Sequence, residues 1–297
     1  MDPAPAPLDP GRPLRLGFSP CPNDCFVFDA LVHGRIDTPL RFDVVLEDVE
    51  ALNGMARAAE LDVAKVSWHA VGHLTDDWWM LRAGGALGHG VGPLLVARNA
   101  GVDLSGARVA VPGGTTTAKL LLRLFAPEGV DEVVLRYDRI MPAVAAGEVD
   151  AGLIIHESRF TYADHGLVAL ADLGTWWEAR TGGLLPLGGI AVRKALGRDV
   201  AREVGRAVAA SVAAAFDDPT ASEPYVAAHA QELSPDVRRA HIELYVNRWS
   251  RDVGADGEAA VRRLLAEAHA IGLVPPVPVD LFVPDPGSAD AAKRATT

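Results

Sequence analysis

The sequence predicts a two-lobed α/β fold with mixed sheets, a central cleft and a helical C-terminal region. Three observations support this prediction. Short apolar runs typical of buried strands alternate with helical segments through the first half of the chain, which favours mainly parallel β-α-β units. Two such series are joined by one outgoing and one returning crossover. From Asp199 to about Ile271 the pattern is almost entirely helical and rich in alanine.

The first series of elements begins with a strand at Leu14–Phe18. A turn follows, and Asn23 or Asp24 is expected to cap a helix that ends near Gly34. The remaining elements of this series are strands at 41–49, 62–67 and 79–82 and a short helix at about 51–59.

The glycine-rich segment 84–93 lacks the spacing of a dinucleotide or phosphate-binding loop, and we interpret it as a loop entering a crossover strand at 93–98. The second series comprises strands at 108–111, 132–137 and 151–155, helices at 115–125 and 141–146, and a return strand at 188–192. The predicted organisation is a disordered leader (1–13), a discontinuous lobe 1 (14–92 and 190–283), lobe 2 (93–189) and a flexible tail (284–297).

Composition narrows the class of partner. The chain has 297 residues, 49% of them hydrophobic, which is enough to bury a large core. A formal net charge of −11 without a basic cluster argues against nucleic acid. No apolar run approaches the roughly 20 residues of a membrane span, and the segment 1–7 does not resemble a signal peptide. We expect a cytoplasmic protein with a small-molecule ligand; the composition carries no signal for an oligomeric state.

Two pairs of residues allow alternative chemistry. Cys21 and Cys25 could supply a reactive thiol at a helix start, but their spacing differs from the usual redox C-x-x-C, so packing is favoured. His69 and His73 have a spacing that can place two imidazoles on one helix face. They lack the internal glutamate of the H-E-x-x-H motif, so no metal site is predicted.

His156 is the strongest candidate for catalysis. It follows the apolar run 152–155, which is typical of a buried strand, and is itself followed by Glu157, Ser158 and Arg159. The carboxyl ends of strands line the ligand crevice in open α/β sheets, and histidine exchanges protons near neutral pH. The alternative is a hydrogen-bonded core histidine. The position of further polar groups favours the catalytic interpretation.

Three other polar segments are predicted at strand ends or helix starts: residues 19–24, Lys65–Val66–Ser67 and 113–117. In the last of these, Gly113 and Gly114 permit close approach to a ligand, while free N–H groups and threonine hydroxyls at the helix start can bind a carboxylate or phosphate. Serine and threonine also cap helices without touching a ligand. These three segments and His156 share the same kind of position at strand ends and helix starts. We therefore predict that Ser67, Thr116 and His156 face one cavity.

Several blocks of sequence together resemble the 1,4-dihydroxy-6-naphthoate synthase family of the futalosine route to menaquinone. The similarity runs from about Leu14 to Val283. The blocks are Ser19–Asp24 followed by Phe26 and Phe28, Gly84–Pro93, Arg136–Ile140 and Gly152–Tyr162. One departure is Cys25, where threonine is expected after Asn-Asp.

The resemblance implies a periplasmic-binding-protein-like (type II) fold and a carbon–carbon lyase that converts cyclic dehypoxanthine futalosine into 1,4-dihydroxy-6-naphthoate. By motif, His156 matches the family's proton acceptor, and no metal or other cofactor is implied. The residues that it implies for substrate binding are Lys65, Val66, Ser67, Thr116 and Thr117, and Asn23 is a further candidate. The alternatives are a non-catalytic solute-binding or sensor protein and an enzyme like the chorismate dehydratase of the same route.

Overall fold

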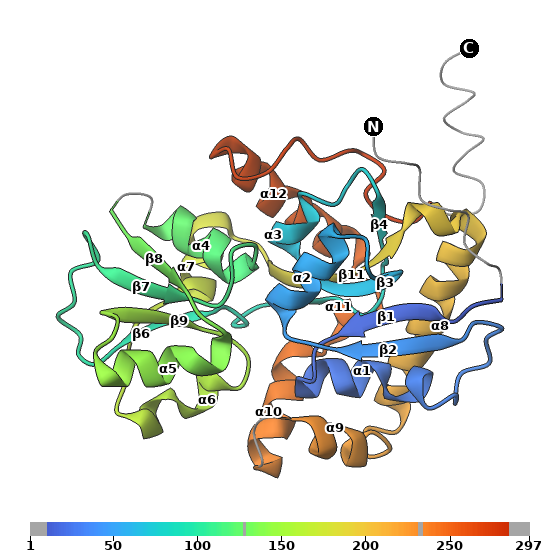
Figure 1. The fold of residues 1–297 in the computed structure, drawn as a ribbon, viewed down its shortest axis with the longest axis horizontal. Helices are drawn as coiled ribbons and strands as arrows, with labels where there is room; N and C mark the ends of the chain where they lie inside the picture. The colour runs from blue at the N-terminus through green and yellow to red at the C-terminus, as the bar shows by residue number, and fades with distance from the viewer. Residues whose placement is uncertain (1–10, 127–128, 231–233, 285–297) are drawn as a thin grey trace.

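A computed structural model describes residues 11–126, 129–230 and 234–284. Within these ranges the chain forms two sheets, each flanked by helices, that lie beside one another (Figure 1). The mixed α/β architecture with a helical C-terminal region is confirmed. Most of the predicted leader (1–13) and tail (284–297) lies outside the described residues.

The first sheet has six strands. In order, it contains β2 (Phe42–Leu46), β1 (Leu14–Phe18), β3 (Val63–Ser67), β11 (Leu185–Arg193) and β4 (Trp78–Met80), with β5 (Ala86–Gly88) also paired to β11. β1 runs parallel to β2 and β3, whereas β11 is antiparallel to β3, β4 and β5. The polar residues that follow β1 and end β3 therefore meet at one edge of this sheet.

The second sheet has five strands. In order, they are β10 (Val168–Asp172), β6 (Leu94–Ala97), β9 (Ala151–Ile154), β7 (Arg108–Val111) and β8 (Asp131–Val134). β7, β8 and β9 are parallel, and β6 is antiparallel to β9 and β10. The helix starting after β7 and the turn after β9 consequently lie at the same sheet edge.

The two crossovers lie side by side. Leu185 pairs with Gly88 and Gly188 pairs with Ala86, so the outgoing and returning chains form an antiparallel pair. Close backbone approach continues nearby, because a Cβ added to Gly92 would lie 2.1 Å from the backbone nitrogen of Gly174. The start of β11 at Leu185 places 185–189 in the first sheet rather than in lobe 2. The other lobe boundaries stay a prediction.

The helices between strands are α1 (Pro22–Val32), α2 (Val49–Arg57), α3 (Trp68–Val71), α4 (Thr117–Phe125), α5 (Tyr137–Ala146), α6 (Ser158–Thr161) and α7 (Leu173–Thr181). The C-terminal helices are α8 (Arg198–Asp217), α9 (Glu223–His229), α10 (Pro235–Tyr245), α11 (Arg248–Arg251) and α12 (Gly254–Ala270). Short 3₁₀ turns occupy Tyr162–His165 and Lys194–Leu196. None of the helices in the described ranges has the length and apolarity that crossing a bilayer requires.

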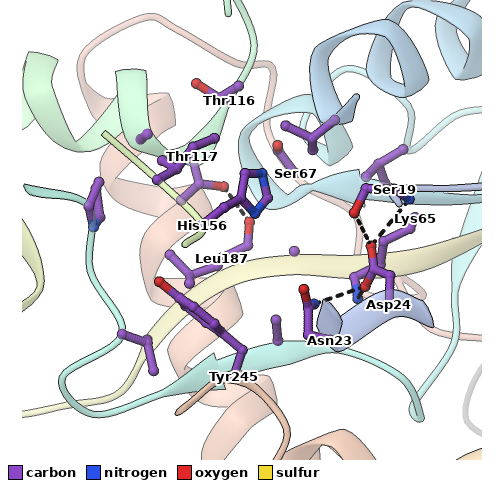
Figure 2. Close-up of a pocket in the computed structure, with 18 of the residues that line it drawn as sticks. Ser19, Asn23, Asp24, Lys65, Ser67, Thr116, Thr117, His156, Leu187 and Tyr245 are labelled. Carbon is purple, nitrogen blue, oxygen red and sulfur yellow. Dashed lines mark hydrogen bonds and ion pairs between the residues drawn. The ribbon is translucent and has the colours of Figure 1, made fainter. Parts of the chain in front are cut away.

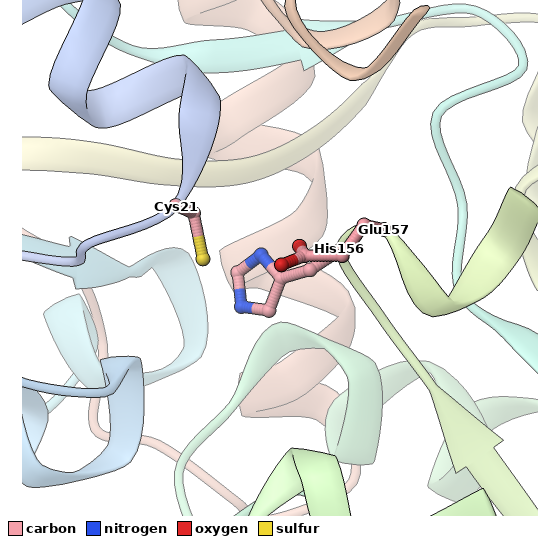
Figure 3. A group of neighbouring side chains, drawn as sticks. All are labelled: Cys21, His156 and Glu157. Carbon is pink, nitrogen blue, oxygen red and sulfur yellow. The ribbon is translucent and has the colours of Figure 1, made fainter. Parts of the chain in front are cut away.

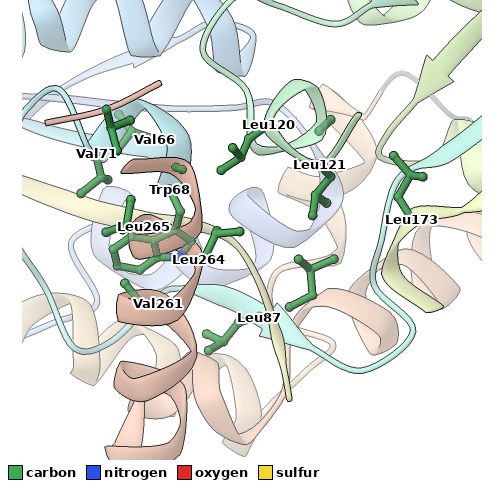
Figure 4. Close-up of a cluster of buried hydrophobic side chains, with 14 of the residues drawn as sticks. Val66, Trp68, Val71, Leu87, Leu120, Leu121, Leu173, Val261, Leu264 and Leu265 are labelled. Atoms are coloured by element: carbon green, nitrogen blue, oxygen red, sulfur yellow. The ribbon is translucent and has the colours of Figure 1, made fainter. Parts of the chain in front are cut away.

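A continuous apolar core joins the two sheets. Trp68 of α3, Leu120 of α4 and Leu264 of α12 are almost completely buried in one cluster (Figure 4). Because this cluster includes side chains from both predicted lobes, part of the contact between them is permanent packing rather than open cleft.

Several element boundaries differ from the predictions. Cys21, not Asn23 or Asp24, is the N-cap of α1, because Pro22 starts the helix. Asn23 and Asp24 therefore belong to the first helical turn. Tyr137 begins α5 instead of ending a strand, and the segment predicted as a loop at 84–93 contains β5.

Candidate active site

A pocket opens where the polar edges of the two sheets meet (Figure 2). Every residue predicted for the site lines it: Asn23, Lys65, Val66, Ser67, Thr116, Thr117 and His156. The expectation that Ser67, Thr116 and His156 face one cavity is thus confirmed. What each residue does to a ligand stays a prediction.

A buried ion pair forms one wall of the pocket. Lys65 Nζ lies 2.6 Å from Asp24 Oδ1 and also donates a hydrogen bond to the Gly84 carbonyl at 3.0 Å. Asp24 further accepts a hydrogen bond from the Ser19 hydroxyl at 2.7 Å. Both charged side chains are less than one-tenth exposed. Since each charge is paired and hydrogen-bonded, the pair is compatible with burial, and it fixes the start of α1 against β3.

The helix start at α4 forms the opposite wall. Thr116 is the N-cap, and its hydroxyl accepts a hydrogen bond from the Lys119 N–H at 3.2 Å. Thr117 donates its hydroxyl to the Leu187 carbonyl at 2.7 Å, which ties α4 to the returning crossover. Both threonine hydroxyls at this wall therefore also stabilise the fold, one as a helix cap and the other as a link to β11.

A carboxylate already occupies the glycine-rich turn before α4. Glu50 of α2 accepts hydrogen bonds from the Gly114 N–H at 2.8 Å and from the Thr115 N–H and hydroxyl, each at 3.1 Å. This contact joins α2, which packs beside the first sheet, to the turn that follows β7 of the second sheet. It also demonstrates that the turn binds an anion, as expected for N–H groups at a helix start. Because the Thr117 hydroxyl donates to the Leu187 carbonyl, the donors that this helix start offers a ligand are the backbone N–H groups of Thr116 and Thr117.

His156 sits at the centre of the pocket on an unusual backbone. It follows β9 with φ of +56°, a left-handed conformation that few non-glycine residues adopt. This turn directs the imidazole into the cavity, where Tyr137 packs edge-on with ring centroids 5.2 Å apart. Burial is the main influence on the His156 pKa and lowers it, while the nearby Glu157 and Asp24 carboxylates oppose that effect. The neutral, basic form is therefore favoured at neutral pH.

Two pocket residues were not anticipated from the sequence. His241 and Tyr245 lie on α10 and line the pocket. The His241 ring stacks on His156 with centroids 6.2 Å apart, and His241 Nε2 lies 2.8 Å from Asn23 Oδ1. Both residues sit in a helical run far along the chain from every motif. A histidine four residues before a tyrosine on one helix face gave the only local signal.

Cys21 and Glu157 lie beside His156 (Figure 3). One donor atom from each of these three residues lies within 4.8 Å of the others, a set of atoms that metal ions can bind. Neither cysteine forms a disulfide. Burial raises the pKa of both thiols, so Cys21 and Cys25 stay protonated at neutral pH. Packing, the favoured interpretation for both cysteines, accords with this environment.

The alternative metal pair, His69 and His73, is engaged in packing. His69 Nδ1 contacts the Thr116 carbonyl at 3.2 Å, and burial lowers the His69 pKa to about 4. The two rings stand 5.9 Å apart between centroids with no carboxylate or thiol grouped around them as a ligand set in the part of the chain that the structure describes. His69 therefore supports α4 from behind the pocket wall.

Comparison with known proteins places the chain in a family. Residues 14–270 match the family model described as menaquinone biosynthesis. The chain belongs to this family. It is 56% identical to a 1,4-dihydroxy-6-naphthoate synthase of Thermus thermophilus over 91% of this chain and 99% of that protein. A synthase of the same name from Streptomyces coelicolor is 53% identical, over 88% and 95% of the two chains. Both of these relatives are named as enzymes.

Solved structures support the fold. A protein of Archaeoglobus fulgidus matches with a TM-score of 0.85 and 38% identity, over 90% of this chain and all of that chain. The periplasmic aliphatic sulphonate-binding protein of Escherichia coli matches with a TM-score of 0.65 at 15% identity, over 92% of both chains. The second likeness confirms the periplasmic-binding-protein-like fold.

Proposed function

We propose that the protein is a carbon–carbon lyase of the cytoplasm that converts cyclic dehypoxanthine futalosine into 1,4-dihydroxy-6-naphthoate with loss of a three-carbon fragment. His156 is the proton acceptor. The observation that carries this proposal is the position of His156, which projects into a pocket lined by every other residue predicted for substrate binding. The names of the two relatives agree with it.

The chemistry of such a cleavage suits this pocket. Breaking a carbon–carbon bond beside a carbonyl requires a base that removes a proton and polar groups that stabilise the developing oxyanion. Neutral His156 supplies the base. Lys65 and Ser67 supply cationic and hydroxyl donors on the facing wall. Aromatisation of the product provides driving force, so the proposed reaction uses no metal or redox cofactor.

The start of α4 orients the substrate in this proposal. Its first N–H groups have no intrahelical partners, and with Thr116 and Thr117 they form a site for the substrate carboxylate. Glu50 holds the preceding turn, so its carboxylate marks the outer limit of this anion site. The reacting end of the substrate then points toward His156.

Replacing both Thr116 and Thr117 with valine is expected to weaken substrate binding by about 1–3 kcal/mol, because the hydrogen bonds to Lys119 N–H and to the Leu187 carbonyl that hold this helix start in place are lost. The change should appear mainly in KM or in the dissociation constant. Replacing both with serine keeps the hydroxyls and is the matched control. Unchanged KM and product yield in the valine variant would place the carboxylate site elsewhere.

Incubation of the purified protein with cyclic dehypoxanthine futalosine, followed by mass analysis, tests the function. We expect dihydroxynaphthoate and a three-carbon product. Binding without turnover would identify a solute-binding protein instead. Dehydration of chorismate by the same preparation would identify the dehydratase branch.

A further inference from the structure

A buried carboxylate and a buried imidazole nitrogen face each other next to His156. Glu157 and His241 are almost inaccessible to solvent. Glu157 Oε2 lies 3.7 Å from His241 Nδ1. Neither oxygen of Glu157 nor Nδ1 of His241 has a hydrogen-bond partner among the described residues. Buried polar atoms without partners are rare, so this group calls for a physical explanation.

The neighbouring hydrogen bonds fix which ring nitrogen of His241 carries a proton. Lys65 pairs with Asp24, which is therefore an acceptor. The Asn23 amide donates Nδ2–H to Asp24 at 3.0 Å, which turns its carbonyl oxygen toward His241. That oxygen only accepts, so His241 Nε2 must donate to it over 2.8 Å. A neutral imidazole then has a bare lone pair at Nδ1.

Without a further proton, the lone pair of Nδ1 would face the negative carboxylate of Glu157. This arrangement is repulsive in a site shielded from water. One proton held between the two groups removes the repulsion, and a small closing of the 3.7 Å separation between Glu157 Oε2 and His241 Nδ1 would make it a shared hydrogen bond. Burial, followed by the effect of His156, holds the pKa of His241 well below its ordinary value, which disfavours an unpaired imidazolium at this position.

We propose that Glu157 and His241 share one proton, and that this dyad is the acid that protonates the departing fragment while His156 acts as the base. The proposal rests on the proposed lyase function. His241 lines the pocket beside Asn23 and is the catalytic residue of the dyad. Glu157 does not line the pocket and acts through His241 as a positioning residue that holds the proton.

The proton transfers balance. His156 forms an N–H bond to the proton that leaves the substrate, and the electron pair stays with the substrate. After the carbon–carbon bond breaks, the negative centre replaces Asn23 Oδ1 as the acceptor of the His241 Nε2–H group and takes its proton. His241 Nδ1 simultaneously takes the proton from the Glu157 carboxyl, so His241 changes tautomer and remains neutral. The site then holds a Glu157 carboxylate and a His156 imidazolium. Transfer of one proton from His156 to His241 Nε2, with the Nδ1 proton returning to Glu157, restores the starting charges and the starting tautomer of His241.

The geometry favours this exchange of charge. A ring nitrogen of His156 and a carboxylate oxygen of Glu157 lie within 4.8 Å of each other, so the two charges created during the reaction attract. The other titratable groups around the dyad come from several elements: Cys21 at the start of α1, Tyr137 of α5, Tyr245 of α10, Arg159 of α6, and the Asp24–Lys65 pair. Burial raises the pKa of Cys21, Tyr137 and Tyr245, so these three remain neutral near pH 7.

The variant Glu157→Gln separates hydrogen bonding from proton transfer. A glutamine amide can still donate to His241 Nδ1, but it has no proton to release. We expect kcat to fall by about 10²–10⁴-fold with KM nearly unchanged. Glu243→Gln, an exposed position on α10, is the matched control and should behave as wild type.

Nuclear magnetic resonance of isotope-labelled histidine in the ligand-free protein provides an independent readout. In the wild type we expect the signal of His241 Nδ1 to show that this nitrogen shares a proton with the Glu157 carboxyl group. A bare Nδ1, or a Glu157→Gln variant with wild-type kcat, would overturn the dyad. A stoichiometric metal ion in the wild type that Glu157→Gln loses would overturn it too, because the carboxylate would then be a ligand. Absence of product from the wild type would instead refute the lyase function.

Discussion

Replacement of His156 by asparagine is expected to lower kcat by about 10²–10⁴-fold, the usual contribution of general-base catalysis. Asparagine keeps similar size and some hydrogen bonding but accepts no proton at neutral pH. It also tolerates the left-handed backbone that His156 adopts, at φ of +56°. Folding and ligand binding should therefore survive. Steady-state kinetics together with binding of the uncleaved substrate measure the two effects separately.

The pH profile provides a second test of the same residue. Only neutral His156 accepts a proton, so wild-type activity should fall as pH decreases through the His156 pKa. Burial lowers that pKa below its ordinary value of 6.5, which places the acid limb below this pH. His156→Asn should have no such limb. Near-normal kcat in a folded His156→Asn protein would rule the histidine out as the base.

Replacement of Lys65 by methionine is expected to lower the free energy of unfolding by about 3–5 kcal/mol, because it leaves the Asp24 carboxylate buried without its cation. The ammonium lies 2.6 Å from Asp24 Oδ1, and the Gly84 carbonyl loses its donor as well. Substrate affinity should also fall, since Lys65 lines the pocket. Denaturant titration of the ligand-free protein measures the stability change.

The matched control for Lys65 is an exposed ion pair. Arg136 and Asp138 lie 2.6 Å apart, but the arginine side chain is 61% exposed. Arg136→Met should change the unfolding free energy by less than about 1 kcal/mol, as for most surface pairs. Equal stability changes for Lys65→Met and Arg136→Met would contradict the importance assigned to burial of the Asp24–Lys65 pair.

The sequence predicted the parts of the fold in which local pattern and tertiary environment agree. β1, β3, β7 and β9 are short and almost wholly buried, so their apolar runs stand out. β10 was not predicted because its residues are exposed or half-buried, and α7 has no clear apolar stripe around Trp177. Pro22 is the first residue of α1, so the cap lies at Cys21 rather than at the predicted Asn23 or Asp24.

The site was predictable where it follows from sheet geometry. Lys65, Ser67 and His156 end or follow strands whose carboxyl ends meet at the cleft. His241 and Tyr245 could not be found in this way, because α10 reaches the pocket through the packing of the C-terminal helices against α1. The hydrogen bond between Asn23 Oδ1 and His241 Nε2 could not be predicted either, because the two residues are 218 positions apart in the chain.

A single-turnover reaction tests the central claim most directly. Excess wild-type protein and excess His156→Asn protein are each mixed with cyclic dehypoxanthine futalosine, and both products are quantified over time. The account predicts equal amounts of dihydroxynaphthoate and three-carbon fragment from the wild type, and bound but uncleaved substrate from His156→Asn. Intact substrate in the wild-type reaction, or equally fast cleavage by the variant, would contradict it.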